Sequence, residues 1–279
     1  MTARHQESIR RITVALDASA SSLAALEAAL DLAAQWGAEV EGIFVEDINL
    51  LRWASLPFAV EVGHVSGEFR RSNRPDVERQ LRTLADRAHA HLRRAADRRG
   101  VRASFRKVQG NVVAALRAAL GETDLVTIGR GERPRTGRSG LGSTARALAA
   151  GRRGLVFVIS QRVRLASPIA LLFDDSAIGH RALMIAFDVA RRSAQPLAII
   201  TAGERAELPE DLLDRAAHAA VELRTYHIRT DRPSRLAAMA QGISAGILVV
   251  SAEQFSPEEI EEVASAFPGA LLLVGQPGS

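Results

Sequence analysis

The sequence predicts an α/β fold made of two tandem units, each a five-stranded parallel sheet flanked by helices. Short apolar strands alternate with helix-forming segments along the 279 residues, which is typical of a parallel sheet covered on both faces. The pattern also restarts, because a shift of 157 residues places Asp17 on Asp174 and Ser19 on Ser176. We therefore predict a tandem duplication.

The first unit opens with a strand at Ile12–Leu16 that ends at Asp17. A helix is expected next, because SASSLAALEAALDLAAQWG offers a serine cap, a helix-forming body and Gly37 as a stop. Further strands are expected at residues 40–45, 103–108, 125–128 and 155–159, and helices at residues 76–99, 112–120 and 143–150.

One segment of the first unit has no clean period. Residues 46–75 are expected to form a long, partly apolar excursion. Its apolar part, residues 48–62 with Trp53 and Phe58, is either a lid over a ligand site or a packing contact between the two copies.

The stretch RVRLASP (162–168) is interpreted as a linker, which gives domains at residues 1–161 and 168–279. The second unit repeats the order of the first in a shortened form. Beyond the strand that ends at Asp174, strands are expected at residues 197–201, 223–228, 247–250 and 270–274, and helices at residues 210–221, 233–241 and 257–266.

Composition and charge limit the function classes. No apolar run approaches the roughly 18–20 residues that span a bilayer, and the chain has no cysteine, so the cytoplasm is the default compartment. Residues 1–160 carry 25 basic against 17 acidic side chains, whereas residues 161–279 carry 11 against 15. An anion site is therefore expected in the first unit.

The loop GRGERPRTGRSGLGST (129–144) combines five glycines, four arginines and one glutamate. A P-loop is rejected, because Ser143 stands where GxxxxGK[ST] requires lysine. A dinucleotide fingerprint is weak, because Gly140 and Gly142 lie about ten residues beyond the strand. A third pattern, GxxGx9G[ST], fits better: Gly129 is its first glycine, and Gly142 and Ser143 follow in register.

With this pattern, and with VALDASAS, VED and GSTARAL at the matching places, the first unit resembles the universal stress protein family. The chain is similar to a tandem member, which implies Rossmann-like or flavodoxin-like domains. The resemblance also implies that the halves associate through their fifth strands as an intramolecular pseudo-dimer, and that a homodimer could form. No nucleic-acid or membrane partner is expected.

The resemblance implies an adenine nucleotide, ATP, ADP or AMP, with Mg²⁺ accompanying ATP. Asp17 and the Val45 backbone would face adenine and ribose, Ile128 and Gly129 would floor the site, and the residues that open the next helix would hold phosphates. Free N–H groups and the helix dipole favour an anion there. The expected binding residues are Ala15, Asp17, Val45, Ile128, Gly129, Gly131, Arg138, Gly142, Ser143 and Thr144.

One residue departs from the family pattern. Glu132 stands where the second glycine belongs, and Gly131 lies one residue early. The glutamate would oppose phosphate unless the arginines of the loop outweigh it; these are Arg130, Arg133, Arg135 and Arg138.

The second copy fails the same test. Ser251 takes the place of the first glycine, and the acidic stretch SAEQFSPEEIEE has no Gly-Ser at the helix start, so no nucleotide is expected there. Asp174 would be a relic or a helix cap. The arginine pairs of residues 93–99 are interpreted as a solvated face, and His89 and His91 as surface residues, with no metal or catalytic site.

The sequence thus predicts a stress-response regulatory protein that binds an adenine nucleotide in its first domain, with slow hydrolysis or none. The alternative is a protein-interaction module that has lost the nucleotide. An enzyme of the related nucleotide α-hydrolase group is disfavoured, because DASASS replaces that group's SGGxDS loop.

Overall fold

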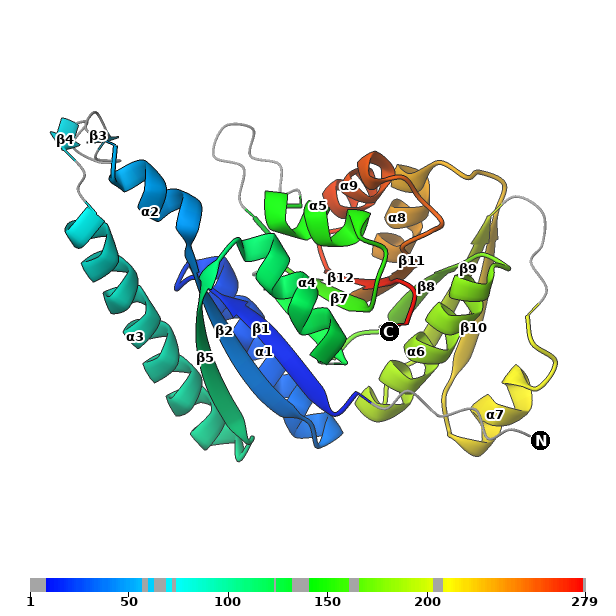
Figure 1. The fold of residues 1–279 in the computed structure, drawn as a ribbon. Helices are drawn as coiled ribbons and strands as arrows, with labels where there is room; N and C mark the ends of the chain where they lie inside the picture. The colour runs from blue at the N-terminus through cyan, green and yellow to red at the C-terminus, as the bar shows by residue number, and fades with distance from the viewer. Residues whose placement is uncertain are drawn as a thin grey trace.

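A computed structural model describes residues 9–56, 60–62, 69–71, 74–122, 124–131, 141–160, 166–202 and 208–277. We refer to residues 9–160 as the first half and to residues 166–277 as the second half. The halves lie side by side and contribute to one twisted sheet with helices on both faces (Figure 1).

The first half contains β1 (Arg11–Leu16), α1 (Ala20–Trp36), β2 (Glu39–Asp47), α2 (Ile48–Ala54), β3 (Val60–Val62), β4 (Phe69–Arg71), α3 (Arg74–Arg99), β5 (Ala103–Gly110), α4 (Val112–Glu122), β6 (Leu125–Gly129), α5 (Ser143–Ala150) and β7 (Leu155–Ile159). The second half contains β8 (Ile169–Phe173), α6 (Ala177–Ser193), β9 (Leu197–Ala202), α7 (Leu212–His218), β10 (Leu223–Ile228), α8 (Pro233–Gly242), β11 (Ile247–Ser251), α9 (Pro257–Ala266) and β12 (Ala270–Val274).

The main sheet has ten strands in the order β10-β9-β8-β11-β12-β7-β6-β1-β2-β5. Within each half all pairings of this sheet are parallel, and both halves follow the strand order 3-2-1-4-5. In the first half, β3 and β4 pair antiparallel as a separate two-stranded sheet. β7 and β12 pair antiparallel, with Phe157 opposite Leu272. The predicted α/β fold with five-stranded parallel units is confirmed, and the two units form one continuous sheet.

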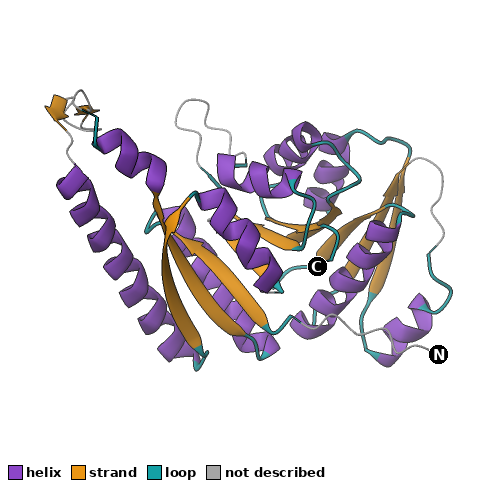
Figure 2. Cartoon of the chain, viewed as in Figure 1, coloured by secondary structure: helices purple, strands orange, loops and turns teal. Residues whose placement is uncertain are grey.

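Helices lie on both faces of this sheet (Figure 2). Two apolar layers of buried side chains hold them there. Buried residues of α1, α2, α3, α6 and α7 pack on one face. Buried residues of α4, α5, α8 and α9 pack on the other. The central strands are buried on both sides, as expected for parallel strands covered twice.

The helix start and stop predicted for α1 are present. Ser19 is its N-cap and accepts a hydrogen bond from the Ser22 N–H, and Gly37 ends it with a positive φ of 67°, which glycine adopts without strain. The second half repeats the start at α6, where Ser176 accepts from the Gly179 N–H.

The excursion after β2 is more regular than the sequence indicates. Asp47 accepts a hydrogen bond from the Asn49 N–H and begins the seven-residue helix α2, which packs on α3 and β5. The missing periodicity has a physical reason, because α2 buries only Leu51 and Ala54 while Trp53 is 37% exposed. Phe58 lies outside the described residues.

Candidate functional site

The predicted ligand edge lies where the strand order reverses, between β1 and β6. In open α/β sheets, ligands bind beyond the carboxyl ends of the strands at such a switch point. Asp17 follows β1 directly, Val45 lies near the end of β2, and Gly129 ends β6. The pairing of β1 with both β2 and β6 brings these three positions to one edge.

Three of the predicted residues share one apolar layer. Ala15, Val45 and the buried Ile128 all belong to the layer packed under α4 and α5. Leu141 is also buried in this layer and precedes Gly142 directly. The start of α5 is therefore fixed against the strands that carry the other candidate residues.

Asp17 is exposed at this edge but already has a local role. Its Oδ1 accepts a hydrogen bond from the Ser19 N–H at 2.9 Å, next to the first turn of α1. Asp174 does the same in the second half, where its Oδ1 accepts from Ser176 N at 3.2 Å and from Ser176 Oγ at 2.5 Å. The repeated aspartate therefore supports a helix cap in both halves.

Gly129 is required by packing. A Cβ at this position would lie 2.5 Å from the carbonyl carbon and oxygen of Ser21 and 2.9 Å from Ser22 N. The close approach that glycine permits here is to the first turn of α1. Any contact of Gly129 with a ligand stays a prediction.

Gly131 and Gly142 form what we call the neck of the loop. A Cβ on Gly131 would lie 2.8 Å from the Gly142 Cα, and a Cβ on Gly142 would lie 3.3 Å from the Gly131 Cα. The two ends of the loop therefore touch backbone to backbone. Residues 132–140, which include Glu132 and Arg138, lie outside the described residues.

The N-terminus of α5 lies at this neck, and among the described residues no side chain caps it. Gly142 is its N-cap residue, and the first helical residues, Ser143 and Thr144, are exposed and half-buried. By contrast, serine side chains cap α1, α6 and α9. An uncapped helix start offers N–H donors and a partial positive charge to an anion.

Arg130 does not contribute to the loop charge as the sequence analysis expects. Its side chain is buried, with 4% exposed, and its guanidinium crosses to the second half. It donates to three carbonyl oxygens: Ala264 at 3.0 Å, Phe267 at 2.8 Å and Gly269 at 2.9 Å. Burial lowers the pKa of Arg130 to about 10, and the charge of Glu261 partly offsets this effect.

No local pattern in the sequence distinguishes Arg130 from the three other arginines of the loop. Its partners lie more than 130 positions away in the chain, so the signal is purely tertiary. The sequence analysis counts Arg130 among the arginines that could offset Glu132, but its buried charge lies against the second half. The remaining loop arginines are Arg133, Arg135 and Arg138, all outside the described residues.

The basic end of α3 is a solvated face at Arg93, Arg94 and Arg98, which are exposed as predicted, and Arg99 is the exception. Arg99 is only 22% exposed in its side chain, and it pairs with Glu27 at 2.7 Å and Asp31 at 2.6 Å on α1. His91 Nε2 lies 2.7 Å from Glu27 Oε1, and His89 stacks on Phe105. Burial opposes ionisation of Glu27, but hydrogen bonds from His91 and Arg99 outweigh it and lower its pKa.

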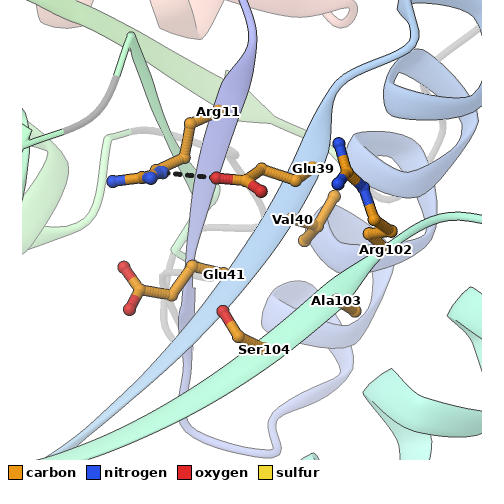
Figure 3. A pocket seen from close by; sticks show the side chains of 7 residues that line it. All are labelled: Arg11, Glu39, Val40, Glu41, Arg102, Ala103 and Ser104. Carbon is orange, nitrogen blue, oxygen red and sulfur yellow. Dashed lines mark hydrogen bonds and ion pairs between the residues drawn. The ribbon is translucent and has the colours of Figure 1, made fainter.

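Two cavities lie at the opposite edge of the sheet. One, of about 310 Å³, opens beside the first residues of β1, β2 and β5, and within its lining Arg11 Nε lies 2.7 Å from Glu39 Oε1 (Figure 3). The other, of about 500 Å³, opens beside the ends of α4 and α5. The residues around the second cavity are Arg117, Ala118, Leu120, Gly121, Leu148, Gly151 and Arg153. Neither cavity contains a predicted nucleotide residue.

Searches for other kinds of site add two findings. Within the described ranges, no group of three or more His, Asp or Glu side chains could hold a metal ion. The helices of that same part of the chain are all too short or too polar to cross a membrane.

The fold and the switch-point edge define an open-sheet α/β protein of the Rossmann-like class. The model of the universal stress protein family matches residues 8–151, more than half of the chain. The chain therefore belongs to the universal stress protein family. A search of curated proteins finds no match.

Solved structures support the fold over nearly the whole length. A universal stress protein from Archaeoglobus fulgidus DSM 4304 has a TM-score of 0.69 at 15% identity, covering 95% of this chain and 96% of that chain. A protein of unknown function from Pseudomonas aeruginosa PAO1 has a TM-score of 0.60 at 14% identity, with coverage of 98% and 94%. A putative universal stress protein from P. aeruginosa UCBPP-PA14 has 0.57 at 15%, with coverage of 96% and 94%.

Proposed function

We propose that the chain is a stress-response regulatory protein that binds an adenine nucleotide at the carboxyl edge of β1 and β6. The observation that carries this proposal is the uncapped N-terminus of α5 at the glycine neck. It lies at the switch point of the sheet, where α/β folds bind their ligands. Family membership supports the same conclusion.

The predicted residues divide by chemistry. Ala15 and Val45, which are half-buried, would contact adenine above the buried Ile128, and Asp17 would offer an acceptor for the ribose hydroxyls. The phosphates would meet the first N–H groups of α5 and the glycines of the neck; the residues that we assign to them are Gly129, Gly131, Gly142, Ser143, Thr144 and Arg138. ATP, ADP and AMP all fit this assignment, and Mg²⁺ would accompany ATP.

Binding rather than turnover is the proposed activity. Asp17 is the carboxylate that we place at the site, and we assign it to the ribose hydroxyls, away from the phosphates where water would attack. A general base needs a free acceptor within hydrogen-bond reach of the attacking water. We therefore expect very slow hydrolysis or none.

The chain organisation belongs to the same proposal. The two halves would be tandem domains, residues 1–161 and 168–279, joined as an intramolecular pseudo-dimer. The antiparallel pairing of β7 with β12 supports this, because each fifth strand then pairs along the edge that it would otherwise expose to solvent. A homodimer would then use other surfaces, and the cytoplasm stays the expected compartment.

The test is a direct search for the ligand. The purified protein is denatured and the released nucleotide identified by chromatography, and the emptied protein is then titrated with ATP, ADP and AMP by calorimetry, with and without Mg²⁺. The control is Gly142→Val, whose side chain would enter the contact with Gly131. We expect wild-type binding below millimolar concentration and none in the variant.

Failure has a clear form. The proposal is wrong if denaturation releases no nucleotide and millimolar ATP also gives no binding heat. A Glu132→Gly variant measures the remaining question of charge, because it removes the one acidic residue of the loop. We expect it to bind a few times more tightly, in keeping with the modest energies of exposed charges.

One observation favours the alternative of an interaction module without a nucleotide. Leu50, Trp53 and Leu56 are exposed large apolar residues at i, i+3 and i+6 along α2 and the residues after it. Exposed apolar patches often mark interaction surfaces. The same calorimetry separates the two functions, because the module would stay folded and show no binding of any nucleotide.

A further inference from the structure

Arg130 connects the predicted nucleotide loop of the first half to the second half. It stands between Gly129, which packs on α1, and Gly131, which packs on Gly142. Its backbone N–H donates to the Ile159 carbonyl at 2.7 Å, so the backbone is held on β7 while the side chain reaches α9.

The partners of Arg130 suit a cation. Ala264 lies in the last turn of α9, and Phe267 and Gly269 follow that helix, so their carbonyls lie at its negative end. The planar guanidinium satisfies all three oxygens together, which a lysine ammonium on a flexible stem does not match. Ser160 strengthens the same contact by donating to the Pro268 carbonyl at 2.8 Å.

A second contact ties α5 to the same helix. Arg146 Nη2 lies 3.1 Å from Glu261 Oε2, and α5 packs beside α9 (Figure 1). Arg130 precedes the neck and Arg146 follows it, so the neck is anchored to α9 on both sides. Both anchors come from the first half, and both partners come from the second.

We propose that α9 acts as a brace for the nucleotide site of the first half, with Arg130 as the positioning residue. This inference rests on the proposed function. It gives the second half a regulatory role, although we expect the second half to bind no nucleotide. Arg130 fixes Gly131, Gly131 sets the place of Gly142, and Gly142 opens the helix that faces the phosphates. Because coupling is reciprocal, bound nucleotide would in turn stabilise the contact with α9.

The test compares Arg130→Lys with Arg192→Lys. Arg192 is a matched control, because it is also an arginine shielded from solvent that crosses between the halves, donating to the Trp36 carbonyl at 3.3 Å. Trp36 ends α1, at the far end from the turn that packs on Gly129. Both variants are measured where circular dichroism shows them folded.

The first measurement needs no nucleotide. Native-state hydrogen exchange by NMR follows the Arg146 amide, which donates to the Gly142 carbonyl, against amides of β1 and β2 as internal references. We expect Arg130→Lys to speed exchange at Arg146 about tenfold relative to the references, and Arg192→Lys to leave that ratio unchanged. An unchanged ratio in Arg130→Lys would overturn the brace.

The second measurement is affinity. Calorimetry with ATP should show about 3- to 30-fold weaker binding in Arg130→Lys and wild-type binding in Arg192→Lys. In the wild type, ATP should slow exchange of the Phe267 amide, which closes the end of α9. Equal weakening in both variants, or full affinity in Arg130→Lys, would overturn the positioning role.

The two failures remain distinguishable. If the wild type binds no nucleotide, the proposed function fails, and so does the claim that Arg130 controls affinity. The exchange at Arg146 still decides whether α9 braces the neck. Glu261→Gln provides a milder second variant that weakens the Arg146 contact and should give a smaller rise in the same exchange ratio.

Discussion

The connection from β6 to α5 and the connection from β11 to α9 begin alike and end differently. Both leave the fourth strand of their half with the same hydrogen bond to the fifth: Arg130 N donates to the Ile159 carbonyl at 2.7 Å, and Ala252 N donates to the Val274 carbonyl at 2.8 Å. The first connection then takes 13 residues (130–142), and the second takes five (252–256).

The helix starts that follow show what the extra residues are for. α9 closes its own N-terminus with a capping box, in which Ser256 accepts from the Glu259 N–H and Glu259 accepts from the Ser256 N–H. It adds Glu258 in the same turn. α5 begins after Gly142, which has no side chain to cap the helix and which contacts Gly131 at the neck. A capping box satisfies N–H donors that an anion would otherwise meet, so α9 is a poorer anion site than α5. We therefore keep the proposed ligand edge in the first half and the proposed brace in the second.

The sharpest way to break this comparison is to exchange the residues at the strand ends. Gly129→Ser places a Cβ 2.5 Å from the Ser21 backbone, and backbone cannot rotate away, so we expect a loss of about 1–3 kcal/mol or more in the free energy of unfolding. Urea denaturation followed by circular dichroism measures it.

The reciprocal change, Ser251→Gly, is the control. Ser251 is buried and its Oγ accepts a weak hydrogen bond from the Glu253 N–H at 3.3 Å, so its removal should cost about 1 kcal/mol. Equal losses at the two sites would show that the glycine is not required by the approach of β6 to α1.

The second prediction separates the two aspartates that cap alike. Asp17→Ala and Asp174→Ala each remove an acceptor at a helix start and should each cost about 1 kcal/mol of stability. Only Asp17→Ala should also weaken ATP binding, by about tenfold, which corresponds to 1.4 kcal/mol. Calorimetry on both variants checks this, and a loss of affinity in Asp174→Ala would contradict our assignment of the site to the first half.

How far sequence reasoning reaches depends on the range of the interaction. The start and end of α1 follow from residues within a turn of Ser19 and Gly37, and Asp174 accepts a hydrogen bond from Ser176 N as Asp17 does from Ser19 N. These contacts are local, so their signals are local too. The α/β fold follows for a similar reason, because the alternation of strands and helices is written along the chain.

The site is predicted less completely because its decisive contacts are distant. Gly129 must be glycine because the backbone of Ser21, more than 100 positions earlier, packs against it. Arg130 is held by carbonyl oxygens more than 130 positions later. An arginine beside three others in a polar loop gives no sign that it is buried. The helix α2 is not predicted because it buries only two residues, too few to give a helical period of apolar side chains.

The third prediction tests whether the capping box of α9 is structural only. Ser256→Ala removes the acceptor for the Glu259 N–H and should cost about 1 kcal/mol of unfolding free energy. ATP affinity should not change, because Arg130 binds the other end of α9. Thermal denaturation and calorimetry on one preparation measure both quantities, and weaker ATP binding would show that the whole helix, not only its C-terminal end, controls the neck.

The smallest effect concerns acid, and it compares the outer faces of α1 and α6. Glu27 of α1 contacts His91, Arg98 and Arg99 of α3, whereas the equivalent position of α6 is Met184. Burial raises the pKa of Glu27, but the hydrogen bonds from His91 and Arg99 lower it further, so its folded pKa lies below the usual 4.5. Its stabilising contribution is therefore present above pH 4.5 and is lost as the pH falls through the folded value.

Glu27→Gln should accordingly be less stable than the wild type at pH 6, and the difference should shrink as the pH falls below 4.5. Met184→Gln provides the matched control, since it places the same amide on the equivalent helix, where no carboxylate is lost. Its loss of stability relative to the wild type should be the same at pH 6 and pH 3. Urea midpoints at pH 6 and pH 3 compare them. A Glu27→Gln deficit that is as large at pH 3 as at pH 6 would mean that the α1–α3 contact depends on packing, and that the charges around Glu27 add nothing to the first half that the second half lacks.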